Sequence, residues 1–183
     1  MFIRTERLLL RPGWAEDAPA LAAAIASERI VRNLVHAPWP YRPYHAEAFL
    51  ALPFDLRHPA LLVFERGDDA LVLVGGCALA RNEAGDAELG YWIAEKRWGR
   101  GYATEAARAV LATAAGLGHR RVVSGHFTDN PASGAVLAKL GFRRTGTVQR
   151  ASLARGGRSE MVTMALGGEE ERPAGPCDLP MAA

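Results

Sequence analysis

The sequence predicts one α+β domain built on a mixed, mostly antiparallel sheet of about seven strands. Three strand-like runs at 60–66, 71–81 and 87–94 follow one another with only short turns at 67–69 and 82–86 between them, which is typical of an antiparallel meander. Helical and strand-like segments lie on both sides of this meander in the chain, as they do where helices pack against a mixed sheet. At 183 residues the chain is long enough to bury one hydrophobic core.

Before the meander, a strand at 5–11 ends at a Pro-Gly pair, and a helix at 15–26 begins with two acidic residues that suit the positive end of a helix dipole. The segment 33–45 (NLVHAPWPYRPYH) holds three prolines, so a loop or a broken helix is expected there. A short helix is expected to follow at 45–52.

After the meander, a helix is expected at 103–117, where apolar residues recur at i, i+3, i+4 and i+7 and a glycine follows the last turn. A strand at 121–127 leads to a second helix, which starts with Asp-Asn-Pro and ends near Leu140. Two strands at 142–150 and 159–166 complete the predicted sheet.

The composition changes after Leu166, where the segment 167–183 is rich in Pro and Gly and poor in apolar residues. We therefore expect a folded domain over 1–166 and a disordered acidic tail over 167–183. The whole chain has a formal net charge of +2, and the tail has four acidic residues against one Arg, so residues 1–166 carry +5. The role of the tail stays open.

Several classes of protein are excluded by composition. The net charge of +2 lacks the strong basic excess of a nucleic-acid-binding protein. Cys77 and Cys177 are too few for a disulfide framework, and the five histidines show no metal-ligand spacing, so no metal is expected. No apolar run reaches the ~18 residues of a membrane span, and the N-terminus lacks the pattern of a signal peptide. These observations predict a cytoplasmic protein that binds neither membranes nor nucleic acids.

Residues 98–104 (WGRGYAT) join a predicted strand to a predicted helix. Two glycines in this turn let the backbone approach a ligand, and the free N–H groups at the start of the helix suit phosphate oxygens. Arg97 and Arg100 add positive charge. A P-loop is excluded because no Gly-Lys-Ser/Thr is present, and a Rossmann turn is excluded because Thr104 replaces the third glycine. A simple tight turn remains the alternative.

The run 88–107 (ELGYWIAEKRWGRGYATEAA), together with 130–142 (NPASGAVLAKLGF), resembles the GNAT (GCN5-related) acetyltransferases, and most closely their RimJ/RimL-like branch. This resemblance covers about residues 3–166. It implies the GNAT fold, with a V-shaped splay between strands 87–94 and 121–127. It also implies acetyl-CoA as cosubstrate. Trp98 and Ala103 depart from the usual family pattern, but binding through backbone groups does not depend on those side chains.

The resemblance implies which residues bind acetyl-CoA. Backbone groups of the turn would hold the pyrophosphate, and backbone groups near Ile93 would meet the pantetheine arm and the oxyanion. Asn130 would bind the pantetheine, and Ser133 would lie near the thiolate, although a helix cap is the alternative for Asn130. The cofactor-binding residues expected in this way are Ile93, Ala94, Gly99, Arg100, Gly101, Tyr102, Ala103, Thr104, Asn130 and Ser133.

Acetyl transfer to an amine requires a base for the ammonium and an acid for the leaving thiolate. Ser133 is the candidate acid, because the helix has no Tyr in the region where many family members place one. Glu88 is the candidate base. By strand alternation it shares a face with Gly90 and Trp92. His126, at the end of the neighbouring strand, and water are the alternatives, and Glu88 can instead be a structural residue.

The resemblance places the acceptor site near the N-terminal loop and helices, which singles out Trp39, Tyr41 and Tyr44, with Glu88, for substrate contact. Anchoring of the loop is the alternative for the three aromatic residues. We expect an N-acetyltransferase that acts on a protein N-terminus or a small amine by direct attack through a tetrahedral intermediate. A sensor of the same fold that binds acyl-CoA without transfer is the competing hypothesis. A monomer and a homodimer are both open.

Overall fold

The structure, a computed structural model, describes residues 1–67 and 70–167. The turn predicted at 67–69 lies partly outside these residues, and of the predicted tail only Gly167 lies within them. In chain order the elements are β1 Ile3–Arg4, β2 Leu8–Arg11, the 3-10 helix η1 Ala15–Asp17, α1 Ala18–Ile25, α2 Glu28–Val31, α3 Pro43–Leu50, β3 Ala60–Arg66, β4 Leu71–Arg81, β5 Ala87–Ile93, the 3-10 helix η2 Glu95–Arg97, α4 Tyr102–Ala114, β6 Val122–Phe127, α5 Pro131–Lys139, β7 Arg143–Ser152 and β8 Gly157–Leu166.

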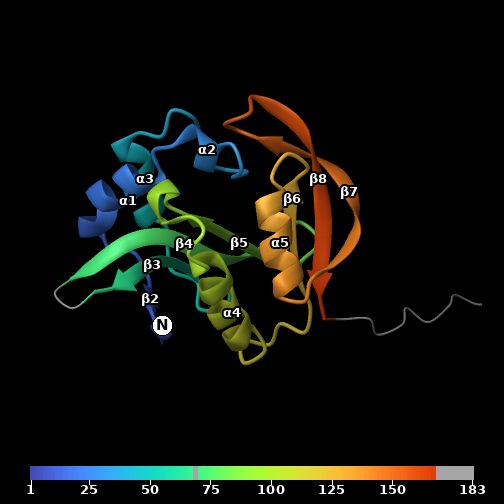
Figure 1. Cartoon of the computed structure of the whole chain (residues 1–183), viewed down its shortest axis with the longest axis horizontal. Coiled ribbons are helices and arrows are strands. Elements are labelled where there is room, and N and C mark those ends of the chain that lie inside the picture. The colour runs from blue at the N-terminus through green and yellow to red at the C-terminus, as the bar shows by residue number, and fades with distance from the viewer. Residues whose placement is uncertain (68–69, 168–183) are drawn as a thin grey trace, which may run out of the picture.

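One eight-stranded sheet has the order β1-β2-β3-β4-β5-β6-β8-β7. All neighbouring strands are antiparallel except β5 and β6, which run parallel and are connected by α4. Figure 1 shows α4 and α5 on one face of this sheet, with α1 and α3 beside the N-terminal strands. The α+β class and the mixed, mostly antiparallel sheet predicted from the sequence are confirmed.

The sheet has eight strands rather than seven because residues 3–11 form a hairpin, in which the strand predicted at 5–11 is shortened to β2 and is preceded by β1. Thr5 lies between the two strands: its N–H donates to the Leu8 carbonyl (2.9 Å), and its Oγ1 accepts from the Leu8 N–H (2.9 Å). A hydroxyl side chain that bonds nearby backbone favours a turn over a continuing strand. The helix predicted at 103–117 also ends earlier, at Ala114, and turns lead from there to Gly118.

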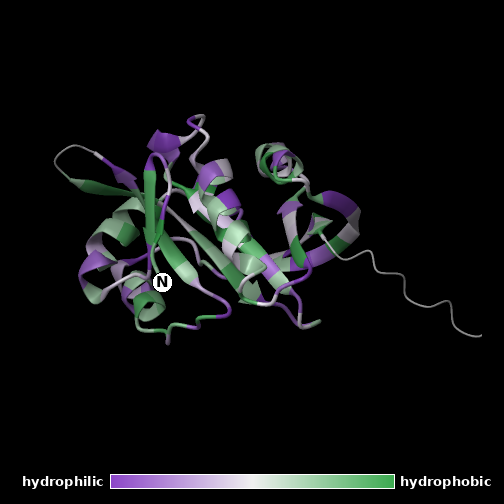
Figure 2. Ribbon diagram, turned by 90° about the horizontal axis from the view of Figure 1, so that it is seen from below, coloured by the Kyte–Doolittle hydropathy of each residue, from purple (hydrophilic) through white to green (hydrophobic). Residues whose placement is uncertain are grey.

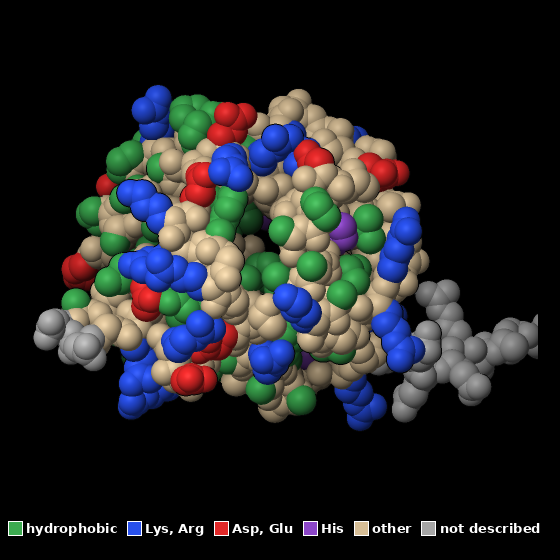
Figure 3. All heavy atoms as spheres, viewed as in Figure 1, with side chains coloured by type: hydrophobic (Ala, Val, Ile, Leu, Met, Phe, Trp, Pro, Cys, Tyr) green, Lys and Arg blue, Asp and Glu red, His purple; other side chains and the backbone are tan. Residues whose placement is uncertain are grey.

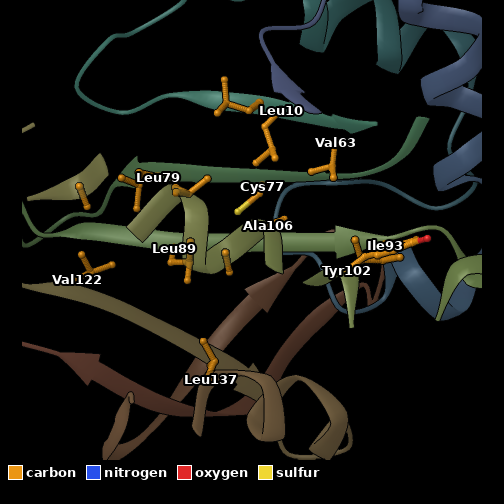
Figure 4. Packing of buried hydrophobic residues seen from close by; sticks show 14 of the residues in the cluster. Leu10, Val63, Cys77, Leu79, Leu89, Ile93, Tyr102, Ala106, Val122 and Leu137 are labelled. Atoms are coloured by element: carbon orange, nitrogen blue, oxygen red, sulfur yellow. The ribbon is translucent and has the colours of Figure 1, made fainter. Parts of the chain in front are cut away.

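Two groups of buried side chains lie on opposite faces of the sheet. On the face of α4 and α5, leucines and valines of the strands meet small residues of α4, as Figure 4 shows for Leu10, Val63, Leu79 and Ala106. On the other face, α1 and α3 cover Leu62 and Phe64. In Figure 2 hydrophobic residues are concentrated on the inner strands. Odd-numbered residues of β5 join the first group and Trp92 the second, as alternation predicts.

The parallel pair β5–β6 opens after two residues. Ala87 pairs with Val122 and Glu88 with Val123, and no further pair joins the two strands in the described part of the chain. At the point of divergence, Ser124 Oγ donates to the Leu89 carbonyl (2.8 Å) and so satisfies a backbone acceptor that has lost its strand partner. This is the V-shaped splay that the resemblance implied.

Candidate active site

The end of β5 directs backbone groups into the splay. The Ala94 N–H donates to the Val74 carbonyl of β4 (2.8 Å). Because hydrogen bonds alternate along an antiparallel pair, the N–H groups of Tyr91 and Ile93 point away from β4, toward β6. Trp98 Nε1 donates to the Ile93 carbonyl (2.6 Å). Of the two residues predicted here to bind the cofactor, Ile93 therefore faces the splay, whereas the N–H of Ala94 is engaged by β4.

The turn from Gly99 to Thr104 forms a cradle of backbone donors. Gly99 and Gly101 have positive φ angles of 76° and 80°, which favour glycine. A Cβ on Gly99 would meet nothing within 4 Å, so the space above the turn is open. Within the described residues, no N–H group of residues 99–104 donates to a backbone carbonyl. Free N–H groups at a helix N-terminus fit a pyrophosphate, as predicted for this turn.

The charged groups beside the cradle include residues that the sequence did not single out. Arg97 lies 2.9 Å and Arg100 3.8 Å from carboxylate oxygens of Glu65 on β3, so one acidic group offsets both. A neighbouring pocket of about 430 Å³ is lined by seven residues, which are Glu6, Arg7, Gly101, Thr104, Glu105, Arg108 and Lys139. Figure 3 shows a hollow in the middle of this face, bordered mostly by hydrophobic side chains and backbone, with Lys and Arg side chains farther out.

Glu105 connects the β1–β2 turn to the first turn of α4. Its carboxylate accepts from Thr5 Oγ1 (2.6 Å) and from Arg7 Nε (2.8 Å), and Arg7 Nη1 donates to the Arg100 carbonyl (2.9 Å). Burial raises the pKa of Glu105, but the hydrogen bonds from Thr5 and Arg7 outweigh it and hold the pKa below its ordinary value. These contacts fix the turn at residues 99–104 to the β1–β2 turn.

The first turn of α5 brings Asn130 and Ser133 to the other edge of the splay. Asn130 is the N-cap, and its side chain accepts from the Ser133 N–H (3.3 Å), so the capping interpretation is confirmed. The hydroxyl of Tyr91 lies 2.9 Å from Ser133 Oγ and 3.0 Å from the Ser133 carbonyl. Burial raises the pKa of Tyr91 to about 12, although the hydrogen bond with Ser133 opposes this shift.

Sequence reasoning missed Tyr91. It lies inside the run 88–107 that carries the family resemblance, but its position on the same face as Leu89 and Ile93 indicated only burial. Its partner Ser133 is 42 residues away, so no local spacing could connect them.

Glu88 lies on the opposite face of β5 from Tyr91. A carboxylate oxygen of Glu88 is 3.6 Å from Arg150 Nη2, and both side chains line a pocket of about 200 Å³ with Arg121 and Asn82. A Cβ on Gly90, two residues further along the same face, would meet nothing within 4 Å. A ligand can therefore reach the backbone of β5 on this side.

His126 is poorly placed as a base. Its Nδ1 lies 3.0 Å from the Phe127 carbonyl, which only accepts, so Nδ1 carries the hydrogen and Nε2 is the basic nitrogen. Nε2 abuts the backbone of α5, where a Cβ on Gly134 would lie 2.6 Å from it. The close approach of α5 to β6 thus turns the basic nitrogen toward a helix.

The three aromatic residues of the Pro-rich segment differ in exposure. Trp39 is 41% and Tyr44 62% exposed, whereas Tyr41 packs partly buried against the group covered by α1 and α3. Burial also raises the pKa of Tyr41. Tyr41 thus has the anchoring position that was the alternative for this segment, while Trp39 and Tyr44 leave their rings available to a ligand.

The tip of the β7–β8 hairpin docks on the beginning of that segment. The Leu153 N–H donates to the Val35 carbonyl (3.1 Å), and Arg155 Nε donates to the Arg32 carbonyl (2.7 Å). Asp129, next to the cap of α5, accepts from Arg155 Nη2 (2.7 Å) and Arg32 Nη2 (2.9 Å). The hydrogen bond from Arg155 holds the pKa of Asp129 below its ordinary value. Figure 1 shows the hairpin reaching α2 at the top of the molecule.

No helix among the described residues is long and apolar enough to cross a bilayer. No group of three or more His, Cys, Asp or Glu side chains in residues 1–67 and 70–167 is arranged to hold a metal ion.

Comparison with solved structures gives the class of the fold. A GNAT-family acetyltransferase from Bacillus anthracis superposes with a TM-score of 0.77 at 22% identity, over 91% of this chain and 98% of the other. RimL, a ribosomal L7/L12 α-N-protein acetyltransferase solved in complex with coenzyme A, superposes with a TM-score of 0.76 at 22% identity, again over 91% and 98%. The fold is therefore that of the GNAT acetyltransferases, and the second neighbour is consistent with the resemblance to the RimJ/RimL branch.

Comparison of sequences gives the family. The model of the acetyltransferase (GNAT) domain matches residues 7–143. The uncharacterized N-acetyltransferase YoaA of Bacillus subtilis (strain 168) is 29% identical over 155 residues, which are 81% of this chain and 86% of that protein. The chain belongs to the GNAT acetyltransferase family and is an acyltransferase of that class.

Proposed function

We propose that the protein transfers the acetyl group of acetyl-CoA to a primary amine by direct attack in the β5–β6 splay. The observation that carries this proposal is the cradle at residues 99–104, whose N–H groups have no backbone partner in the described part of the chain and which borders the splay. RimL, the neighbour solved with coenzyme A, has the same fold and supports acetyl-CoA as cosubstrate.

Each part of the cosubstrate has a candidate partner. The N–H groups from Gly99 to Thr104 would hold the pyrophosphate, with Arg108 and Lys139 supplying positive charge nearby. The Ile93 N–H, which faces the splay, would bind the thioester oxygen and stabilise the oxyanion. Ser133, at the edge of the splay, would donate a proton to the leaving thiolate.

The acceptor would enter from the other face of the sheet. Glu88 lies on that face, beside the open surface of Gly90, and would accept a proton from the ammonium directly or through water. The two reactants would then meet in the splay from opposite sides. This arrangement allows direct attack, because the amine needs no covalent intermediate on the protein to reach the thioester carbon.

The acceptor is a primary amine, either a protein N-terminus or a small molecule. RimL supports the first class, since it is an α-N-protein acetyltransferase. The exposed rings of Trp39 and Tyr44 suit either class, because both peptides and small amines stack on aromatic faces.

The test is thiol release from acetyl-CoA in the presence of a panel of peptides with free N-termini and of small amines, with acetyl-CoA binding measured in parallel. Turnover with at least one amine and a mass increase of one acetyl group on that amine are expected. Binding without turnover on any amine would favour the sensor hypothesis. A chain that does not bind acetyl-CoA would contradict both functions.

A further inference from the structure

The hydroxyl of Tyr91 contacts Ser133 at two atoms. Its oxygen lies 2.9 Å from Ser133 Oγ and 3.0 Å from the Ser133 carbonyl oxygen. Tyr91 comes from β5 and Ser133 from the first turn of α5, so this contact joins the two edges of the splay. No step of the proposed function uses it.

A phenol has one hydrogen, so the contact has two arrangements. If Tyr91 donates to the Ser133 carbonyl, its oxygen is available to accept from the Ser133 hydroxyl, which draws the serine hydrogen toward Tyr91. If Tyr91 donates to Ser133 Oγ instead, the Ser133 hydrogen cannot bond to Tyr91 and is free to point into the splay. The direction of the Tyr91 O–H bond therefore biases where Ser133 presents its proton.

The groups around Ser133 indicate that Tyr91 sets the direction of the Ser133 O–H bond. A serine in the first turn of a helix tends to bond to nearby backbone, which would turn its hydroxyl away from a ligand. At this position Asn130 already accepts the Ser133 N–H, and Tyr91 is the side-chain partner of the hydroxyl within the described residues. Tyr91 is partly buried and packs with the group under α4, so its ring is held in place.

We propose that Tyr91 is the positioning residue for Ser133, holding the serine hydroxyl toward the leaving sulfur and donating to its oxygen while the proton is transferred. This inference rests on the proposed function, because it assigns a role within the same reaction. Tyr91 does not itself contact the reacting atoms in this assignment.

The C–S bond of the tetrahedral intermediate breaks with its electron pair on sulfur, and the Ser133 Oγ–H proton passes to that sulfur. The serine oxygen accepts a hydrogen bond from the Tyr91 hydroxyl as its proton leaves. It regains a proton through solvent water, which is the equivalent of the proton that Glu88 removed from the ammonium, so protons and charge balance over the cycle.

The experiment combines Tyr91→Phe, Ser133→Ala and the double variant in steady-state thiol release with acetyl-CoA and the best amine of the panel. Tyr91→Phe is expected to lower kcat about 10-fold, since it removes a hydrogen bond to a charged oxygen, and to leave the coenzyme A dissociation constant within about two-fold. In the Ser133→Ala background the same change is expected to have almost no effect. Thr113→Val, which removes another helix hydroxyl that donates to the Val110 carbonyl, is the matched control and is expected to keep the wild-type kcat.

Three results would overturn the assignment. Wild-type kcat in Tyr91→Phe would exclude a positioning role. An equal loss in both backgrounds would show that the hydroxyl acts on structure rather than through Ser133. A wild-type chain that binds acetyl-CoA but acetylates no amine would overturn the proposed function and this inference together, and this outcome differs from the first two because the wild type is then inactive.

If Tyr91→Phe does not fold, 3-fluorotyrosine incorporated at position 91 alone keeps the ring and the hydroxyl. Its phenol is a stronger donor, so kcat is expected to rise about two-fold with unchanged coenzyme A binding. An unchanged kcat would contradict the proposal.

Discussion

The two faces of the β5–β6 splay are built from different groups. On the α4 face, the cradle at residues 99–104 presents backbone N–H groups, and the side chains around it hold the turn from outside. On the α1 face, Glu88 and Arg150 present side chains on the side where the surface of Gly90 is open. The first face would bind a cosubstrate common to the family, and the second an acceptor that varies between members.

The two faces are therefore expected to tolerate different substitutions. Hydrogen bonds from backbone N–H groups do not depend on most side chains, but they are lost when a new side chain blocks the approach of the ligand to the backbone. On the α1 face, one substitution removes one side-chain contact, and its loss is expected to weaken binding or deprotonation of the acceptor rather than binding of acetyl-CoA.

Gly101→Val is expected to have the largest effect. A β-branched residue is strained at a φ of 80°, and its side chain would occupy the approach to the cradle. Loss of about two charge-assisted hydrogen bonds corresponds to a fall of roughly 10³-fold in kcat/KM for acetyl-CoA, mainly through KM. Gly85→Val is the control, since Gly85 has a φ of 89° in the β4–β5 turn, away from the cradle. Equal KM values for the two variants would contradict the backbone assignment.

Glu88→Gln is expected to lower kcat/KM for the amine about 10²-fold, because the ammonium loses its proton acceptor. The loss should shrink as the pH rises past the pKa of the amine, since the nucleophile is then already neutral. Acetyl-CoA binding, measured by calorimetry, should not change. Glu160→Gln on the exposed part of β8 serves as the control. A loss that is the same at every pH would assign Glu88 a structural role.

Trp39→Ala is expected to raise KM for the amine about 10-fold through lost stacking, without changing KM for acetyl-CoA. Phe54→Ala is a matched control, because both rings are 41% exposed. A change in KM for acetyl-CoA would contradict the assignment of Trp39 to the acceptor site.

The smallest effect concerns stability on the acceptor side. The hydrogen bond from Arg155 lowers the pKa of Asp129, so its contribution to stability is present above the pKa of an unfolded Asp, about 3.9, and is lost as the pH falls through the lower folded value. Asp129→Asn should lower Tm by about 2 °C at pH 7, and the difference from the wild type should vanish near pH 2. Thermal unfolding between pH 2 and 7 measures this. A difference that is constant over this range would show that the charge is not responsible.

Local patterns in the sequence were sufficient for much of the fold. The three strands of the meander, the helix after residue 101 and the cap at Asn130 lie where periodicity and turn residues predicted them. The hairpin at Thr5 was missed because its first strand has only two residues, which precede the run 5–11, and the turn depends on one hydroxyl that bonds to Leu8. The cap at Asn130 could be predicted because its partner is three residues away.

The part of the candidate site that consists of backbone groups could be predicted from the sequence. The part that depends on contacts between residues far apart in the chain could not. The glycines of the cradle are adjacent in sequence to the helix whose N–H groups they expose. By contrast, Glu65 offsets the charge of Arg97 and Arg100, and Arg7 meets Glu105 98 residues away. His126 stays an alternative base by sequence, and only the fold shows that its Nε2 lies against Gly134 of α5.

The sequence by itself determined the α+β class, the order of most elements and the position of a phosphate-type turn, because periodicity, capping residues and glycines act over a few residues. The tertiary structure alone decided which charges and hydroxyls meet, including Arg150 with Glu88 and Tyr91 with Ser133. Such contacts join segments that only the folding of the sheet brings together, and the geometry of the splay follows from where β5 and β6 stop pairing.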